Sequence, residues 1–107
     1  MTDKYMVVFN TCPDRTTADA LAQALVELNL AACVSILPGA RSVYRWQGKI
    51  ETAEEQLLMI KTRTDRYAEV ERELKARHPY QVPEIIALPV TQGLAPYLSW
   101  IDDNVGK

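Results

Sequence analysis

The fold of this chain is decided by residues 32–62, ACVSILPGARSVYRWQGKIETAEEQLLMIKT. This stretch holds an apolar run at 32–37, a Pro38-Gly39 break, the dipeptide Gln47-Gly48 and a second apolar run at 57–60. Gly48 supplies the positive φ that a tight hairpin turn needs. The pattern predicts one very long β-hairpin, whose tip projects roughly 30 Å past the break at ~3.3 Å per residue.

Two aromatic side chains stand on one face of this predicted hairpin. Ser42, Tyr44 and Trp46 share one parity, and successive strand side chains point to opposite faces. A small monomer has no core so far out that could bury a tyrosine and a tryptophan. The hairpin therefore predicts a partner subunit, with Tyr44 and Trp46 in the packing between subunits.

Five further elements are predicted outside the hairpin from apolar periodicity and from capping residues. They are a strand at 5–12, a helix at 17–28 capped by Thr16, a helix from Thr64 or Asp65 to Arg77, a strand at 84–92, and a short helix from Pro96 through Ile101. The order β-α-β-β-α-β with an added helix predicts an α+β fold of the ferredoxin-like, split β-α-β kind. Such a fold is a four-stranded antiparallel sheet with two helices on one face.

Three of the predicted strands are apolar on both faces, at residues 6–9, 57–60 and 85–88. A strand with two apolar faces is buried on both sides, but the helices cover only one face of this sheet. Either another copy of the chain covers the other face, or the C-terminal helix folds back over it. We favour the oligomer, because that helix is short.

The composition predicts a single domain over residues 1–107. The net charge is −2 and no basic stripe is present, which argues against nucleic-acid binding. No apolar run approaches the ~18 residues of a membrane span. The start Met1-Thr2-Asp3-Lys4 leads at once into a strand, so we expect no signal peptide. Two unclustered cysteines fit free thiols in the cytoplasm.

The segment His78-Pro79-Tyr80-Gln81-Val82-Pro83-Glu84 is the first candidate site. Its prolines stiffen a loop that presents the only histidine, a tyrosine and a carboxylate, which is a platform for a cation or a small ligand. Alternatively, His78 caps the preceding helix. Cys12 is a possible soft-metal partner of His78 for copper or zinc, although packing explains a lone cysteine equally simply. Cys33 is expected to be a small buried apolar residue.

Glu55 and Lys61 form the second candidate, because they share a strand face with apolar residues. They either line a polar cleft between subunits or form an ion pair across the interface. We assign Trp46, Glu55, Lys61, Tyr80 and Glu84 to the cleft or ligand site. Catalytic motifs are absent from the sequence, so we do not expect an enzyme.

The whole motif set resembles the CutA-like divalent-cation tolerance proteins over nearly the full chain. The residues that carry the resemblance are Leu30-Ala31-Ala32-Cys33-Val34, Pro38-Gly39, Ser42-x-Tyr44-x-Trp46-x-Gly48-x-Ile50, Lys61-Thr62, His78-Pro79-Tyr80-x-x-Pro83-Glu84-Ile85 and Tyr97-Leu98-x-Trp100. The resemblance implies a ferredoxin-like homotrimer, similar to the PII signal proteins, whose hairpin reaches the neighbouring subunit. It also implies a link to copper and other divalent cations, no enzymatic activity, and a packing role for Trp100.

The sequence departs from the copper-binding pattern of that family at two positions. Asn10 stands where copper-binding members have a cysteine, with Cys12 shifted by two residues, and Arg77 replaces the first histidine of a pair, leaving His78 alone. We therefore expect weak binding of copper or another divalent cation, and no obligatory cofactor. The alternatives are a PII-like small-ligand signalling trimer and a trimeric scaffold for protein partners.

Overall fold

The computed structural model describes residues 3–106. The start at Met1 and Thr2, on which the expectation of no signal peptide rests, lies outside the described residues. Four strands, three α-helices and a short 3-10 turn follow one another along these described residues. They are β1 (Tyr5–Cys12), α1 (Arg15–Glu27), β2 (Cys33–Trp46), β3 (Lys49–Arg63), the 3-10 turn (Thr64–Arg66), α2 (Tyr67–Arg77), β4 (Ile85–Pro89) and α3 (Ala95–Asn104).

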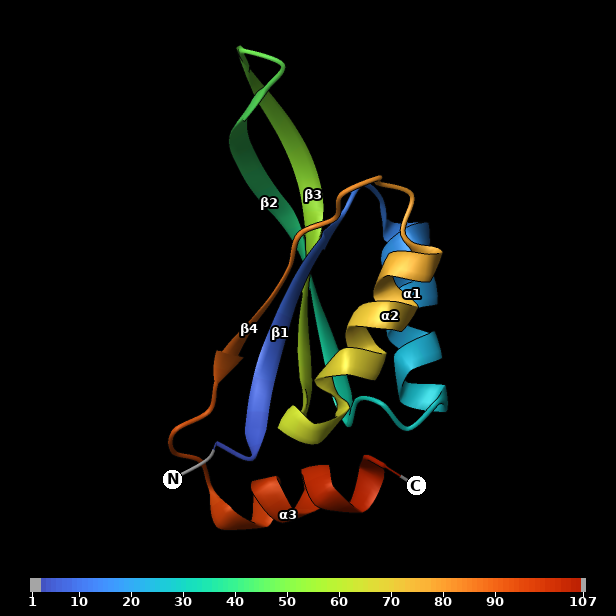
Figure 1. The fold of residues 1–107 in the computed structure, drawn as a ribbon, viewed down its shortest axis with the longest axis vertical. Helices are drawn as coiled ribbons and strands as arrows, with labels where there is room; N and C mark the ends of the chain where they lie inside the picture. The colour runs from blue at the N-terminus through green and yellow to red at the C-terminus, as the bar shows by residue number, and fades with distance from the viewer. Residues whose placement is uncertain (1–2, 107) are drawn as a thin grey trace.

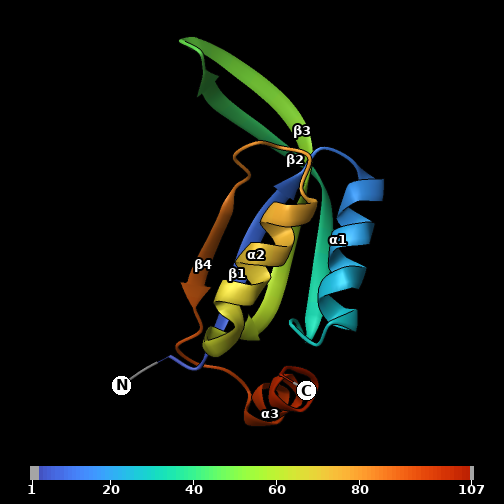
Figure 2. The same cartoon turned by 45° about the vertical axis from the view of Figure 1, so that its right-hand side comes forward.

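The strands form one antiparallel sheet in the order β2-β3-β1-β4. Helices α1 and α2 lie side by side against one face of that sheet, and α3 crosses its lower end (Figures 1 and 2). The predicted α+β class, with a four-stranded antiparallel sheet and helices, is therefore confirmed.

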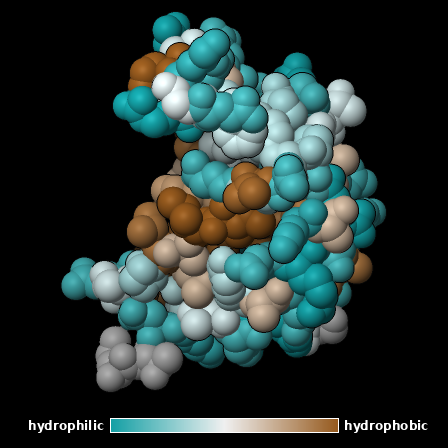
Figure 3. Space-filling view, turned by 45° about the horizontal axis from the view of Figure 1, so that its top comes forward, coloured by the Kyte–Doolittle hydropathy of each residue, from teal (hydrophilic) through white to brown (hydrophobic). Residues whose placement is uncertain are grey.

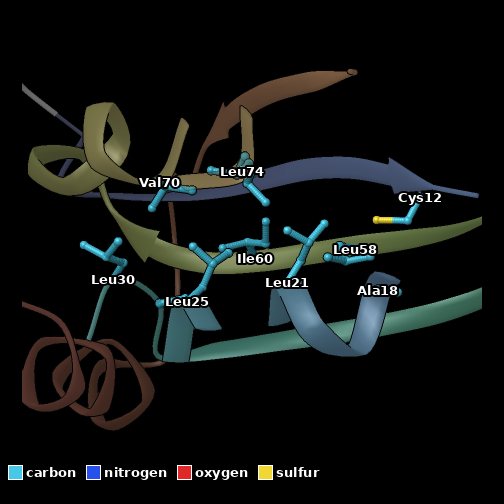
Figure 4. Close-up of a cluster of buried hydrophobic side chains, with 11 residues drawn as sticks. Cys12, Ala18, Leu21, Leu25, Leu30, Leu58, Ile60, Val70 and Leu74 are labelled. Carbon is cyan, nitrogen blue, oxygen red and sulfur yellow. The ribbon is translucent and has the colours of Figure 1, made fainter. Parts of the chain in front are cut away.

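The core lies between the sheet and the two helices (Figure 4). Leu21 and Leu25, four residues apart on α1, meet Leu74 of α2 over Leu58 and Ile60 of β3, and all five are buried. This follows from the two periodicities, because helix residues four apart and strand residues two apart each share a face. This core thus fixes the positions of β1, β3 and both helices.

Several predicted boundaries were wrong. The second helix begins at Tyr67, after the 3-10 turn, so neither Thr64 nor Asp65 caps it, and the last helix continues to Asn104. The first helix begins at Arg15 and is capped by Asp14, whose Oδ1 accepts a 2.8 Å hydrogen bond from the backbone N–H of Thr17. Thr16 instead lies inside the first turn, because the earlier carboxylate is already a good N-cap. The last strand runs from Ile85 to Pro89 rather than from residue 84 to 92, and one further backbone hydrogen bond, from Val90 to Tyr5, follows it.

The long hairpin is confirmed, and it projects well beyond the body of the sheet (Figure 1). Gln47 and Gly48 have φ values of 51° and 80° at its tip. Two successive residues with positive φ match the twist of the flanking strands in a type I′ turn. The turn therefore sits where Gly48 predicted it.

An irregularity at Pro38-Gly39 decides which face the hairpin aromatics occupy. Leu37 pairs with Leu57 and Ala40 pairs with Glu55, so β2 advances three residues while β3 advances two. The extra residue reverses the parity of β2, because directly paired residues share a face of the sheet. As a result Ser42, Tyr44 and Trp46 lie on the same face as Glu55.

The sheet face opposite α1 and α2 remains largely open. Leu37, Ile86 and Leu88 on this face are 42%, 52% and 49% exposed. Ile101 of helix α3 and Val105, the residue that follows this helix, pack against Ala32, so α3 covers only the end of the sheet. In the space-filling view, apolar residues gather in a band below the projecting hairpin tip (Figure 3). The alternative in which the C-terminal helix covers this face is therefore not adopted.

Asp102 ties α3 to the sheet and gives a pH-dependent prediction. Its carboxylate accepts hydrogen bonds from Tyr5 Oη at 2.6 Å and from Lys4 Nζ at 3.3 Å, and these contacts, the tyrosine first, lower the pKa of Asp102. A depressed folded-state pKa contributes stability above the unfolded pKa of about 3.9, and this contribution is lost as pH falls through the folded value. We expect Asp102→Asn to lower the melting temperature at pH 7, with the difference from wild type vanishing at lower pH.

Thermal melts between pH 7 and pH 2.5 test this prediction, with Asp103→Asn as the matched control because Asp103 is exposed on the same helix. An equal effect of the two substitutions at pH 7 would contradict it.

Candidate functional site

A groove of about 710 Å³ opens where the hairpin leaves the sheet. Three elements build it: the paired strands β2 and β3, the end of β1, and the proline-stiffened loop after α2. Its lining residues are Thr11, Ser42, Tyr44, Trp46, Glu55, Pro79, Tyr80, Gln81, Val82, Pro83 and Glu84. The volume lies in the range typical of small-molecule sites.

Glu55 forms the polar base of this groove. The residue is only 7% exposed, and its Oε1 and Oε2 accept hydrogen bonds from Ser42 Oγ at 2.7 Å and from Tyr80 Oη at 2.8 Å. Among residues 3–106, no lysine, arginine or histidine nitrogen lies within ion-pair distance of its carboxylate. Both partners of this buried carboxylate are therefore neutral hydroxyls.

Tyr80 is held as a hydrogen-bond donor. Burial, followed by the hydrogen bond to Glu55 and the charge of that carboxylate, raises the pKa of Tyr80 to about 12. The phenol stays protonated at neutral pH and donates to Glu55. Through Tyr80, the loop after α2 therefore contributes a fixed hydrogen-bond donor and an aromatic ring to the groove wall.

His78 is buried behind the groove, and both of its ring nitrogens are engaged. The backbone N–H of Tyr80 donates to Nδ1 at 3.1 Å, so the ring proton lies on Nε2, which donates to the carbonyl of Thr11 at 2.8 Å. The His78 and Tyr80 rings also contact each other, with centroids 4.8 Å apart. A metal ion would have to displace one of these hydrogen bonds to reach His78.

Cys12 is fully buried, and burial raises the pKa of its thiol to about 12, with the carboxylates of Asp14 and Glu55 adding to the rise. The thiolate that ligates soft metals is therefore strongly disfavoured. Within the described chain, no three histidine, cysteine or carboxylate side chains are grouped as a metal site. The metal role of His78 and Cys12 stays a prediction, and this donor set does not fit a copper ion.

Asn10 positions the loop that forms one wall of the groove. It is fully buried, its Nδ2 donates to the carbonyl of Glu84 at 2.8 Å, and its Oδ1 accepts from Cys12 Sγ at 3.3 Å. From the sequence, Asn10 was interpreted only as standing in the place of a missing cysteine. A polar residue at the inward parity between Val8 and Cys12 was the available signal for a buried clamp.

The structure brings together four of the five predicted cleft residues: Trp46, Glu55, Tyr80 and Glu84. Lys61 lies elsewhere on β3, where its Nζ contacts Ser35 Oγ and Cys33 Sγ at 2.5 Å and 3.8 Å. Cys33 is only partly buried, in contrast to the expected buried residue.

Ser42 was not predicted as a site residue. Its shared parity with Tyr44 and Trp46 was the signal that could have indicated it.

The predicted packing aromatics are all on the surface of the described chain. Tyr44, Trp46 and Trp100 are 44%, 58% and 43% exposed, and the Trp100 ring lies next to that of Tyr97, with centroids 5.6 Å apart and ring planes tilted by 33°. Their role in packing between subunits stays a prediction.

None of the helices in residues 3–106 has the length and apolar character needed to cross a membrane.

Comparison with known proteins gives a consistent family. The family model described as CutA1 divalent ion tolerance protein matches residues 6–104. The divalent-cation tolerance protein CutA of Thermus thermophilus is 48% identical over 100 residues, which cover 94% of this chain and 97% of that protein. The CutA homolog of Xenopus laevis is 47% identical over 95 residues, but this chain spans only 63% of its length. The crystal structure of CutA from Xylella fastidiosa superposes with a TM-score of 0.94 at 47% identity, covering 98% of this chain and 100% of that one.

Proposed function

Since this chain belongs to the CutA1 divalent ion tolerance protein family, we propose that it supports tolerance of divalent cations as a cytoplasmic homotrimer with a ferredoxin-like subunit. Its role is binding rather than catalysis, and its ligand occupies the groove beside the hairpin. The groove around Glu55 is the observation that carries this proposal. The cytoplasmic setting is supported by the two free cysteines.

Assembly is supported by apolar surface that the single chain leaves open. Ile86 and Leu88 on the sheet and Trp46 on the hairpin are each about half exposed, at 52%, 49% and 58%. Large exposed apolar patches mark interaction surfaces. In a trimer the projecting hairpin would lie against a neighbouring copy, so the groove at its base would become a cleft between subunits.

The groove suits cations better than nucleotides. Its lining includes the carboxylates of Glu55 and Glu84 and no lysine, arginine or histidine. Phosphate binding normally uses basic side chains or glycine-rich backbone, and these lining residues provide neither. The PII-like signalling alternative is therefore less favoured. Carboxylate and hydroxyl oxygens are hard donors, but two carboxylates without a third ligand hold a divalent ion only weakly.

Copper(II) titration tests the role of the groove. Copper(II) binds most tightly among the divalent first-row metal ions. Its affinity for the groove therefore gives an upper limit for the affinities of the other ions in that series. In a Trp100→Phe background, Trp46 is the only tryptophan and reports from the groove wall. We expect saturable quenching of its fluorescence with a dissociation constant of about 0.1–1 mM. Glu55→Gln should weaken this binding severalfold, because the variant removes the buried charge.

Glu54→Gln is the matched control, since Glu54 is exposed on the opposite face of the same strand. His78→Ala serves as a second comparison. Equal quenching of wild type and Glu55→Gln, or binding that is lost only in His78→Ala, would place the ion elsewhere and contradict the proposed site.

A further inference from the structure

Within residues 3–106 of the single chain, Glu55 lacks the counter-charge that a buried carboxylate usually has. The residue is 7% exposed, and its two hydrogen-bond partners, Ser42 and Tyr80, are uncharged. Acidic residues are almost never so deeply buried unless they are paired with a cation. The pairing partner is thus missing from the described part of the chain.

The basic residues on the same strand face are too far away to supply it. Lys49 and Lys61 share this face of β3 with Glu55, and each is six residues from it along the strand. Six residues correspond to about 20 Å at ~3.3 Å per residue. Lys61 is in addition engaged with Ser35. Glu84 adds a second negative charge to the lining, so the part of the groove that residues 3–106 of one chain provide carries uncompensated negative charge.

Aromatic side chains contribute to the lining of the groove. Tyr44 and Trp46 from β2 and Tyr80 from the loop line the groove together with the apolar Val82. The face of a tyrosine or tryptophan ring attracts a cation through the ring quadrupole, most strongly when the site is partly desolvated. A carboxylate at the base with aromatic walls is the arrangement that recognises an ammonium group on an apolar stem.

From this arrangement we infer that the groove binds a small organic cation, a primary ammonium or guanidinium compound with an apolar stem. The inference rests on the proposed function, which places the ligand site in this groove. One carboxylate and aromatic walls suffice for such a cation. A tightly bound metal ion would require a grouped set of three ligands, and residues 3–106 contain no such set. The groove volume of about 710 Å³ also leaves room for the stem.

Benzylammonium is a suitable probe, and benzyl alcohol is its uncharged counterpart of similar size. Both are titrated at pH 7 into the full chain carrying Trp100→Phe, with Trp46 fluorescence as the readout. We expect saturable binding of benzylammonium, at least about tenfold tighter than that of benzyl alcohol, because only the ammonium adds an opposite charge to its hydrogen bond with the Glu55 carboxylate. Equal affinity for the two probes, or no binding of either, would overturn the inference.

Glu55→Gln is expected to remove the preference for the charged probe, while Glu54→Gln leaves it intact. Circular dichroism and light scattering check that both variants keep the wild-type fold and mass. The inference fails if the Glu55→Gln protein assembles to a different mass from wild type and benzylammonium binds neither wild type nor this variant. The missing cation would then belong to a second copy of the chain. Failure with benzylammonium while copper titration still depends on Glu55 would leave the proposed function standing, whereas failure of both removes the groove site altogether.

Discussion

Replacing Asn10 by alanine is expected to lower the free energy of unfolding by about 2–4 kcal/mol, as the sum of a lost buried hydrogen bond and a small cavity. Asn10 is completely buried, and its Nδ2 donates a 2.8 Å hydrogen bond to the backbone carbonyl of Glu84. Its loss also frees the loop that carries Tyr80 and Glu84. The variant should therefore lose affinity for groove ligands in addition to stability.

Urea unfolding followed by circular dichroism measures the first effect, and titration with Trp46 fluorescence measures the second. Gln23→Ala is the control, because Gln23 is an exposed amide on α1 with only a 3.5 Å contact to Glu27. Such surface substitutions usually change stability by less than about 0.5 kcal/mol. Similar unfolding midpoints for the two variants would show that Asn10 does not clamp the loop.

The sequence was most informative where local chemistry and periodicity agreed. Gly48 follows an aromatic strand and precedes another strand, so the turn had a single plausible place, and the structure has positive φ at Gln47 and Gly48. The spacing of Leu21 and Leu25 likewise identified the buried face of α1. These features depend on neighbouring residues alone, which is why sequence patterns predict them.

Features that depend on distant contacts were less accessible. Pro38-Gly39 indicated a break, but only the pairing of Leu37 with Leu57 and of Ala40 with Glu55 shows that one extra residue is inserted there. That insertion decides whether Ser42 faces Glu55 or points away from it. Nothing in the local sequence sets the number of inserted residues, since it is fixed by the register across the two strands.

For the same reason, the site could be predicted only in part. Glu55 and Lys61 share a strand face, as their parity indicated, yet they have different partners because Tyr80 reaches only the first of them. His78 was a reasonable ligand candidate by residue type. Whether an imidazole is free depends on its two hydrogen-bond partners, and here both nitrogens contact the backbone at Thr11 and Tyr80.

Trp46 is predicted to have the largest effect on assembly. Its ring is 58% exposed in the single chain, on a hairpin that projects away from the core (Figure 1). Truncating an aromatic anchor that is buried at an interface typically costs about 3–5 kcal/mol of binding free energy. Trp46→Ala should therefore shift the assembly toward smaller species and lower its melting temperature, whereas wild type should have about three times the 12.1 kDa mass of one chain.

Light scattering over a dilution series measures both masses. Arg45→Ala is the matched control, because Arg45 is the exposed neighbour on the opposite face of β2 and its truncation should leave the mass unchanged. A wild-type mass near 12.1 kDa would exclude the trimer itself. A Trp46→Ala protein that keeps the wild-type mass and melting temperature would instead show that the hairpin aromatics serve the groove alone, with the open face of the sheet holding the copies together.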